Sequence, residues 1–155
     1  MILLIFKTLV FTLLIPGTVA VVLPLMIAEH VSIDGIFSII SGSVFMSLGL
    51  ALYLWCVWDF IVFGKGTPAP IDSPKHLVIR GLYHYSRNPM YVAVLSFIIG
   101  WGLLFNLAIL FAYAAGVASW FQLMILFYEE PILQKTFAEE YSNYKASVNR
   151  WLPML

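Results

Sequence analysis

Two short segments hold most of the polar side chains that could carry out chemistry in this sequence. The first extends from Lys75 to Tyr91 and is rich in basic, histidine and tyrosine residues, and the second is the pair Glu129 and Glu130. Adjacent carboxylates at the edge of an apolar region repel each other and are costly to desolvate unless a cation lies beside them. The elements that carry these segments must therefore bring a cation to the glutamates, and Arg87 is the residue we expect there.

Several other chemistries lack their characteristic motifs. The histidines His30, His76 and His84 are scattered without metal-ligand spacing, and Cys56 is the only cysteine, so we predict no metal site. Neither of the common glycine-rich phosphate-binding motifs occurs. The long apolar segments contain no charged residue, which argues against an ion channel or a proton-coupled transporter.

The composition identifies the class of protein in which these groups lie. Hydrophobic residues make up 62% of the chain and charged residues 10%, and the mean hydropathy is +0.95. An ordinary soluble domain has about 25% charged residues, and a chain of this length could not bury so much apolar surface in water. A disordered or nucleic-acid-binding protein is excluded on the same grounds. The sequence predicts an all-α integral membrane protein.

Three segments without Asp, Glu, Lys or Arg predict the membrane crossings, namely residues 8–28, 35–58 and 88–128. A crossing needs about 20 apolar residues. The third segment is about twice that length, so it must fold back as a hairpin, and Asn106 is the turn-favouring residue near its middle. We expect a single membrane domain, residues 1–155, with four transmembrane helices at about 8–28, 35–59, 89–105 and 107–128.

The first segment contains Pro16 and Pro24, which predict a kinked helix whose freed carbonyls are hydrogen-bonded by neighbouring helices. A signal peptide is the alternative, because the small residues at 17–20 resemble a cleavage region. The apolar run begins at Ile2, however, and is too long for the hydrophobic core of a signal peptide.

Basic residues predict the orientation of the crossings. All eight Lys and Arg residues precede the first crossing, lie between the second and third, or follow the fourth. The positive-inside rule therefore places both termini and the segments 60–88 and 129–155 in the cytoplasm. Apolar residues at helical spacing in the tail predict a cytoplasmic amphipathic helix. Because the hairpin brings its ends together, Arg87 lies near the glutamates, and the simplest interpretation is an interfacial salt bridge.

Several pieces of sequence, in this order, resemble the isoprenylcysteine carboxyl methyltransferase family, which shares its cofactor site with the phospholipid methyltransferases. They are Arg-Asn-Pro-Met-Tyr at 87–91, an apolar hairpin, the glutamate pair, Phe-Ala-Glu-Glu-Tyr-x-x-Tyr at 137–144 and Val-Asn-Arg-Trp-Leu-Pro at 148–153. Upstream, Gly-Thr-Pro-Ala-Pro at 66–70 and Leu-Val-Ile-Arg-Gly-Leu-Tyr at 77–83 are similar to its bacterial members. The resemblance covers about residues 64–153.

This resemblance implies a methyltransferase that uses S-adenosylmethionine and acts on a lipophilic, membrane-borne substrate, with no metal and no nucleic acid partner. For a bacterial-type member it implies the inner membrane. The residues expected to line the cofactor are Lys75, His76, Leu77, Val78, Tyr83, Asn88, Pro89, Met90, Tyr91 and Glu129. Arg87 and Glu130 are the candidate catalytic residues.

Four positions depart from the family pattern. Asn88 stands where eukaryotic members have His, and Ala93 and Ala138 stand where many members have Gly. Ile125 stands where prenylcysteine-specific members have an Arg, with Gln122 the nearest polar residue. We therefore expect an acceptor without a carboxylate, either another membrane lipid or a hydrophobic small molecule.

An amine acceptor would need a proton acceptor, for which His84 is the nearest candidate. Two alternatives to a methyltransferase stay open at this stage. One is an NADPH-dependent enzyme related to sterol reductases, and the other is a small membrane protein without enzymatic activity.

Overall fold

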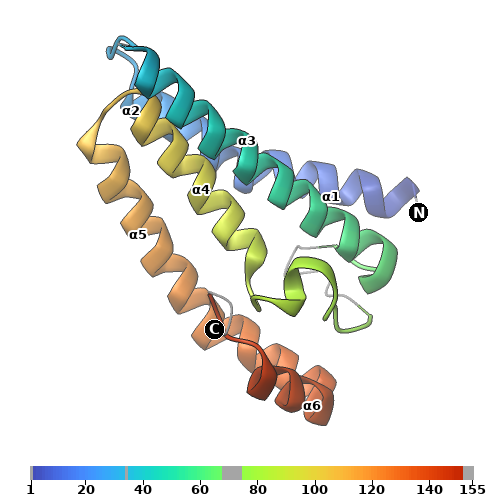
Figure 1. Cartoon of the computed structure of the whole chain (residues 1–155). Coiled ribbons are helices and arrows are strands. Elements are labelled where there is room, and N and C mark those ends of the chain that lie inside the picture. Colours follow the sequence, from blue (N-terminus) through green and yellow to red (C-terminus); the bar gives the residue numbers. More distant parts are fainter. Residues whose placement is uncertain (1, 34, 68–74, 152–155) are drawn as a thin grey trace.

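The computed structural model describes residues 2–33, 35–67 and 75–151, and this part of the chain contains helices and no strand (Figure 1). The longer helices and the short α2 are α1 (Ile2–Leu14), α2 (Leu23–Ile27), α3 (Ile36–Asp59), α4 (Pro89–Leu104), α5 (Ala108–Met124) and α6 (Glu130–Ser147). Three π-helical segments, η1 (Thr18–Val22), η2 (Phe60–Gly64) and η4 (Ile125–Glu129), extend or join them, and η3 (Gly81–His84) is a single 3₁₀ turn. The predicted all-α fold is confirmed.

Within the described residues, three helical stretches are long and apolar enough to cross a membrane: Leu3–Ile27, Ile36–Gly64 and Ala108–Ser147. The helix α4 is also apolar, but its 16 residues span only about 24 Å at 1.5 Å per residue. Large apolar side chains point outward along these helices; Phe37, for example, is 81% exposed. Such surfaces are stable against lipid chains rather than water, which agrees with the predicted membrane protein.

The helical stretch at the N-terminus is interrupted where the prolines predict it. Pro24 has no N–H to donate to the carbonyl of Ala20, and Trp101 Nε1 donates to that oxygen instead, at 2.9 Å. The π-helical segment η1 leaves the carbonyl of Val19 free, and the Tyr113 hydroxyl donates to it at 2.7 Å. Neighbouring helices therefore bond the freed carbonyls, as the sequence predicts.

Small residues let α3 and α4 pack closely. A Cβ added at Gly49 would lie 2.7 Å from the Ala93 carbonyl oxygen, and one added at Gly100 would clash with the Met46 side chain. Ser96 Oγ also donates across this interface to the Phe45 carbonyl at 3.1 Å. Close backbone approach of this kind is a common way for helices to associate in a membrane.

The predicted hairpin joins α4 to α5, and Asn106 lies in the turn with a φ of 48°. Asparagine is among the few residues that adopt this left-handed conformation readily. The predicted helix of the tail is α6, and its apolar residues Leu133, Phe137, Tyr141 and Tyr144 pack in one cluster. It is not separate from the last crossing, because α5, η4 and α6 form one helical stretch, Ala108–Ser147 (Figure 1). This stretch bends at Ala138, whose φ is 40°, so the change of direction comes inside α6 and not before it.

Candidate active site

A cavity of about 360 Å³ lies where the site-bearing elements meet, and α1, α3, α4, α5, α6 and the segment before α4 all contribute to its wall. This volume is within the usual range for small-molecule pockets. Most of the wall is apolar or aromatic. The charged residues among those that line it are Arg87, Glu129 and Glu130, so the cavity combines a large hydrophobic surface with a few charged groups.

Most of the predicted site residues lie on this wall. Nine of the twelve predicted residues line the cavity, namely Leu77, Val78, Tyr83, Arg87, Asn88, Met90, Tyr91, Glu129 and Glu130. The other three do not line it: Lys75 and His76 are exposed, and Pro89 is buried in the first turn of α4. The structure thus brings the segments 77–91 and 129–130, which are far apart in sequence, to the same cavity. The functional roles of these residues stay predictions.

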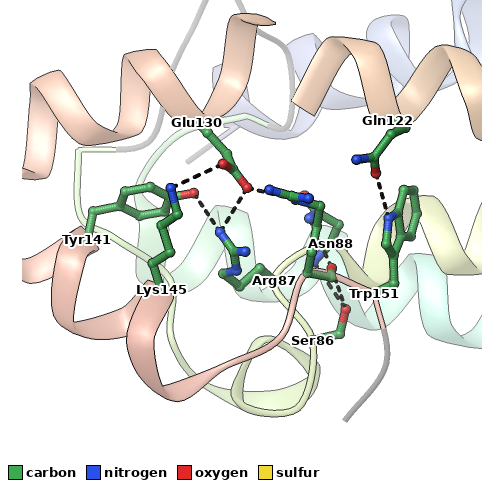
Figure 2. Close-up of polar contacts among 9 residues, drawn as sticks. Ser86, Arg87, Asn88, Gln122, Glu130, Tyr141, Lys145 and Trp151 are labelled. Carbon is green, nitrogen blue, oxygen red and sulfur yellow. Dashed lines mark hydrogen bonds and ion pairs between the residues drawn. The ribbon is translucent and has the colours of Figure 1, made fainter. Parts of the chain in front are cut away.

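The chain after α6 is hydrogen-bonded to the chain before α4. The backbone N–H of Arg87 donates to the Asn149 carbonyl at 2.9 Å. The carbonyl of Arg150 accepts from Asn88 Nδ2 at 3.0 Å and from Ser86 Oγ at 3.2 Å. Figure 2 also shows Trp151 donating to Gln122 of α5, at 2.8 Å. These bonds hold the tail against the cavity and fix the position of Arg87.

Glu130 is buried and is surrounded by cations (Figure 2). Its Oε1 lies 2.9 Å from both Arg87 Nη1 and Arg150 Nε, and its Oε2 lies 3.4 Å from Lys145 Nζ. Three cations around one carboxylate offset its desolvation and leave an excess of positive charge at this end of the cavity. The predicted salt bridge between Arg87 and the glutamates is therefore made with Glu130.

One nitrogen of the Arg87 guanidinium, Nε, is buried without a hydrogen-bond partner among the described residues. Arg87 Nη1 also donates to the Tyr141 hydroxyl at 3.2 Å. An unpaired buried donor is costly, and the Nε–H lies in a residue that lines the cavity.

Glu129 lies in a different environment from its neighbour. Its carboxylate accepts a hydrogen bond from the Tyr91 hydroxyl, and within the described residues it has no cationic partner. The Tyr91 ring stacks on Phe121 of α5, with ring centroids 4.2 Å apart. A half-buried carboxylate beside aromatic rings, without a protein cation, is suited to a cationic ligand.

Tyr83 is part of the packed wall and not a titrating group. Burial, with Cys56 and Tyr144 nearby, raises the pKa of Tyr83 well above its ordinary value. Its ring packs edge-to-face on Phe60, and its carbonyl accepts from the Tyr144 hydroxyl at 2.6 Å. Tyr83 therefore stays neutral and holds the 3₁₀ turn η3 against α3 and α6.

Some residues of the site were not predicted from the sequence. Arg150 and Lys145 bind Glu130, and Tyr141 contacts Arg87, although only the spacing of Tyr141 and Tyr144 along one helix face was visible in the sequence. Phe11 of α1 and Phe121 of α5 also line the cavity. Nothing in an apolar run distinguishes such residues from lipid-facing ones.

The proposed proton acceptor His84 does not face the cavity. It is exposed on η3, packs edge-to-face on Tyr85, and is not among the residues that line the cavity. In the described part of the chain there is also no group of three or more His, Cys, Asp or Glu residues that could hold a metal ion.

Together these features define, over the residues that the structure describes, an all-helical membrane protein with a cavity at one end of its apolar helices. A family model described as phospholipid methyltransferase matches residues 37–140, which is more than half of the chain. The chain therefore belongs to the phospholipid methyltransferase family. No curated protein and no solved structure matches it. Membership of a methyltransferase family supports an enzyme and does not favour the reductase or the non-enzymatic alternative.

Proposed function

We propose that this protein transfers a methyl group from S-adenosylmethionine to a lipophilic substrate in the membrane, as isoprenylcysteine carboxyl methyltransferase-like enzymes do. In this proposal the chain crosses the membrane four times, with both termini and the site on the cytoplasmic side of a bacterial inner membrane. The short α4 completes the fourth crossing with the residues that flank it. The family match and the apolar helices support the membrane methyltransferase, and the cavity supports the cofactor.

The observation that carries the proposal is the contrast between two charged groups on one cavity wall. Glu129 offers a carboxylate with Tyr91 as its partner, and Arg87 offers a buried N–H without a partner among the described residues. The methionine part of the cofactor carries an ammonium and a carboxylate, which complement these two groups. The residues present therefore fit the cofactor: Glu129 would hold the ammonium, and Arg87, which lines the same cavity, would hold the carboxylate.

The aromatic residues beside Glu129 would complete the cofactor site. Tyr91 and Phe121 present stacked rings to the cavity, and such faces attract a sulfonium or pack against adenine. Glu130 then acts as a positioning residue, because it orients Arg87 through an ion pair at 2.9 Å. Asn88 also lines the cavity, and its bond to the carbonyl of Arg150 ties the tail to the chain before α4.

When bound, S-adenosylmethionine supplies a methyl group on a sulfonium, which is already activated toward in-line displacement. The protein needs no nucleophile of its own for this reaction. Its wall has to align the acceptor with the methyl group and exclude water, and the apolar lining is suited to both tasks.

The experiment that tests this proposal compares two glutamate variants of the detergent-solubilised protein. Glu129→Gln keeps the size of the side chain but removes the charge, so binding of S-adenosylhomocysteine should weaken by roughly 1.5–3 kcal/mol, about tenfold to a hundredfold. Glu139→Gln is the matched control, because Glu139 is exposed on α6 and does not line the cavity. Equal affinities for wild type and Glu129→Gln in calorimetry would contradict the assignment of Glu129.

A further inference from the structure

A second hollow lies beside the segment that leads into α4. Its volume is about 530 Å³, and it is lined by Trp55 of α3 and by residues between 79 and 85. None of these residues lines the candidate active-site cavity, which takes Leu77, Val78 and Tyr83 from the same segment. Residues 77–85 therefore contribute to two separate spaces.

The second hollow carries basic groups and, among the residues that the structure describes, no acidic one. Arg80 and His84 line it. Asp59 Oδ1 lies 3.9 Å from Arg80 Nε, but Asp59 is 2% exposed and does not line the hollow. Arg80 Cζ lies 3.5 Å from the centroid of the Phe63 ring. These two contacts hold the Arg80 side chain and use neither of its Nη nitrogens, so these donors can bind an anion.

The second hollow lies at the depth where lipid chains give way to headgroups. Trp55 is about 29 Å along α3 from Ile36, at 1.5 Å per residue, and the hydrocarbon core of a membrane is about 30 Å thick. Trp55 and Trp58 are 53% and 63% exposed, and tryptophans of membrane helices gather at the boundaries of this core. The charge-free run of the sequence ends at the same place, since Asp59 follows Trp58. The hollow is therefore within reach of a lipid headgroup.

One face of α3 leads from the second hollow toward the middle of the membrane. Four exposed residues lie on this face because they recur at helical spacing. They are Val44, Leu48, Ala51 and Trp55. They extend over about 16 Å of helix at 1.5 Å per residue, which is about half the thickness of the hydrocarbon core. A lipid chain can pack along this face while its headgroup lies in the hollow.

We propose that the second hollow binds the phosphate of an anionic phospholipid, whose acyl chain packs along the exposed face of α3. Arg80 and His84 donate hydrogen bonds to the phosphate oxygens. An ammonium headgroup finds no carboxylate among the described residues that line the hollow, which favours a headgroup with a net negative charge. This lipid is distinct from the methyl acceptor, because the hollow and the cavity share no lining residue, and its binding does not depend on the proposed function.

The test is native mass spectrometry of the full-length protein in detergent, titrated with phosphatidylglycerol. The wild type should bind this lipid more tightly than a phosphatidylethanolamine with the same acyl chains. Arg80→Gln removes the cation, so binding of phosphatidylglycerol should weaken about tenfold to a hundredfold. Lys135→Gln is the matched control, because it removes one positive charge from the exposed surface of α6, outside the hollow and the cavity. The control should bind the lipid like the wild type.

His84→Gln keeps the test decisive if Arg80→Gln fails to fold, since Arg80 is also the partner of Asp59. His84 is exposed, so this substitution spares the fold, and it should weaken lipid binding about twofold to tenfold. Equal affinity of the wild type for the two lipids, or wild-type affinity in either folded variant, would overturn the proposal. Displacement of the lipid by millimolar inorganic phosphate would also overturn it, because the hollow would then bind a free anion.

Discussion

Glu129 and Glu130 are adjacent in the chain, but their carboxylates have different partners. Glu130 is bonded by Arg87, Arg150 and Lys145, whereas Glu129 is bonded by the Tyr91 hydroxyl. Because successive residues of a helix point in directions about 100° apart, one side chain can face the ion-pair cluster while the other faces the cavity. We therefore expect Glu130 to act as a structural residue and Glu129 as a ligand-binding residue.

Glu130→Gln should destabilise the protein. The change leaves Arg87, whose side chain is 9% exposed, without its counter-charge, and removing one partner of a buried ion pair costs about 3 kcal/mol or more. The melting temperature in detergent should fall clearly below that of the wild type. Glu129→Gln should melt close to the wild type, and similar melting of the two variants would contradict the division of roles.

Ile125 bears on the chemistry of the acceptor. It is 1% exposed and lines the cavity, at the position where prenylcysteine-specific relatives have an Arg. Arg87 is the basic residue among those lining the cavity, and we assign it to the cofactor. A substrate carboxylate would be left unpaired, at a cost of several kcal/mol.

We therefore expect little methyl ester formation on a farnesylcysteine acid, compared with amphiphiles that have no carboxylate. The measurement is transfer of a labelled methyl group to each acceptor under the same conditions. Efficient esterification of the farnesylcysteine acid would show that the cavity pairs a substrate carboxylate without an arginine at position 125.

At the scale of elements, the α3–α4 interface fixes the loop that leads into the site, because α4 begins directly after Arg87 and Asn88. Gly49→Ala places a methyl group 2.7 Å from the Ala93 carbonyl oxygen, which forces the two helices apart. Overpacking of this kind costs about 1–3 kcal/mol. We expect a lower melting temperature and weaker binding of S-adenosylhomocysteine.

Gly116→Ala in α5 is the control for that prediction, since an added Cβ there meets no atom within 4 Å. Alanine is favoured over glycine inside a helix by about 0.5–1 kcal/mol. The control should therefore melt at the wild-type temperature or slightly above it. A Gly49→Ala protein as stable as Gly116→Ala would mean that the close approach of α3 and α4 does not hold in the membrane.

At the scale of the whole molecule, the distribution of charge predicts the orientation in the membrane. A cysteine at Glu29 should react with a membrane-impermeant maleimide added outside intact cells, and one at His76 should react only in inverted vesicles. Both positions are exposed, and Cys56 is fully buried, so the wild-type protein is the blank. The reverse labelling pattern would contradict the cytoplasmic site.

Much of the fold was predictable because charge-free runs and a turn residue leave few choices. The hairpin at Asn106 and the bonding of the carbonyl freed by Pro24 both follow from general rules and are seen in the structure. The continuation of α5 into α6 was not predictable. The sequence changes from apolar to polar residues there, but a change in composition does not by itself end a helix.

The site was predictable where polar residues carry it, and less so elsewhere. Glu129 and Arg87 stand out in an apolar chain, and both line the cavity. The ion pair between Glu130 and Arg150 depends on how the tail folds back, and no local sequence pattern specifies that. Wall residues such as Ile15 and Phe121 are chemically the same as residues that face lipid, so only the three-dimensional structure separates them.

The central claim is that the cavity binds S-adenosylmethionine and its product, and calorimetry on the purified wild-type protein tests it most directly. Titration with S-adenosylhomocysteine should give saturable binding, and titration with NADPH should give none. Glu129 and Arg87 line the polar end of the cavity. In our proposal they bind the methionine part of this ligand. Saturable binding of NADPH, or no binding of S-adenosylhomocysteine at millimolar concentration, would contradict the methyltransferase.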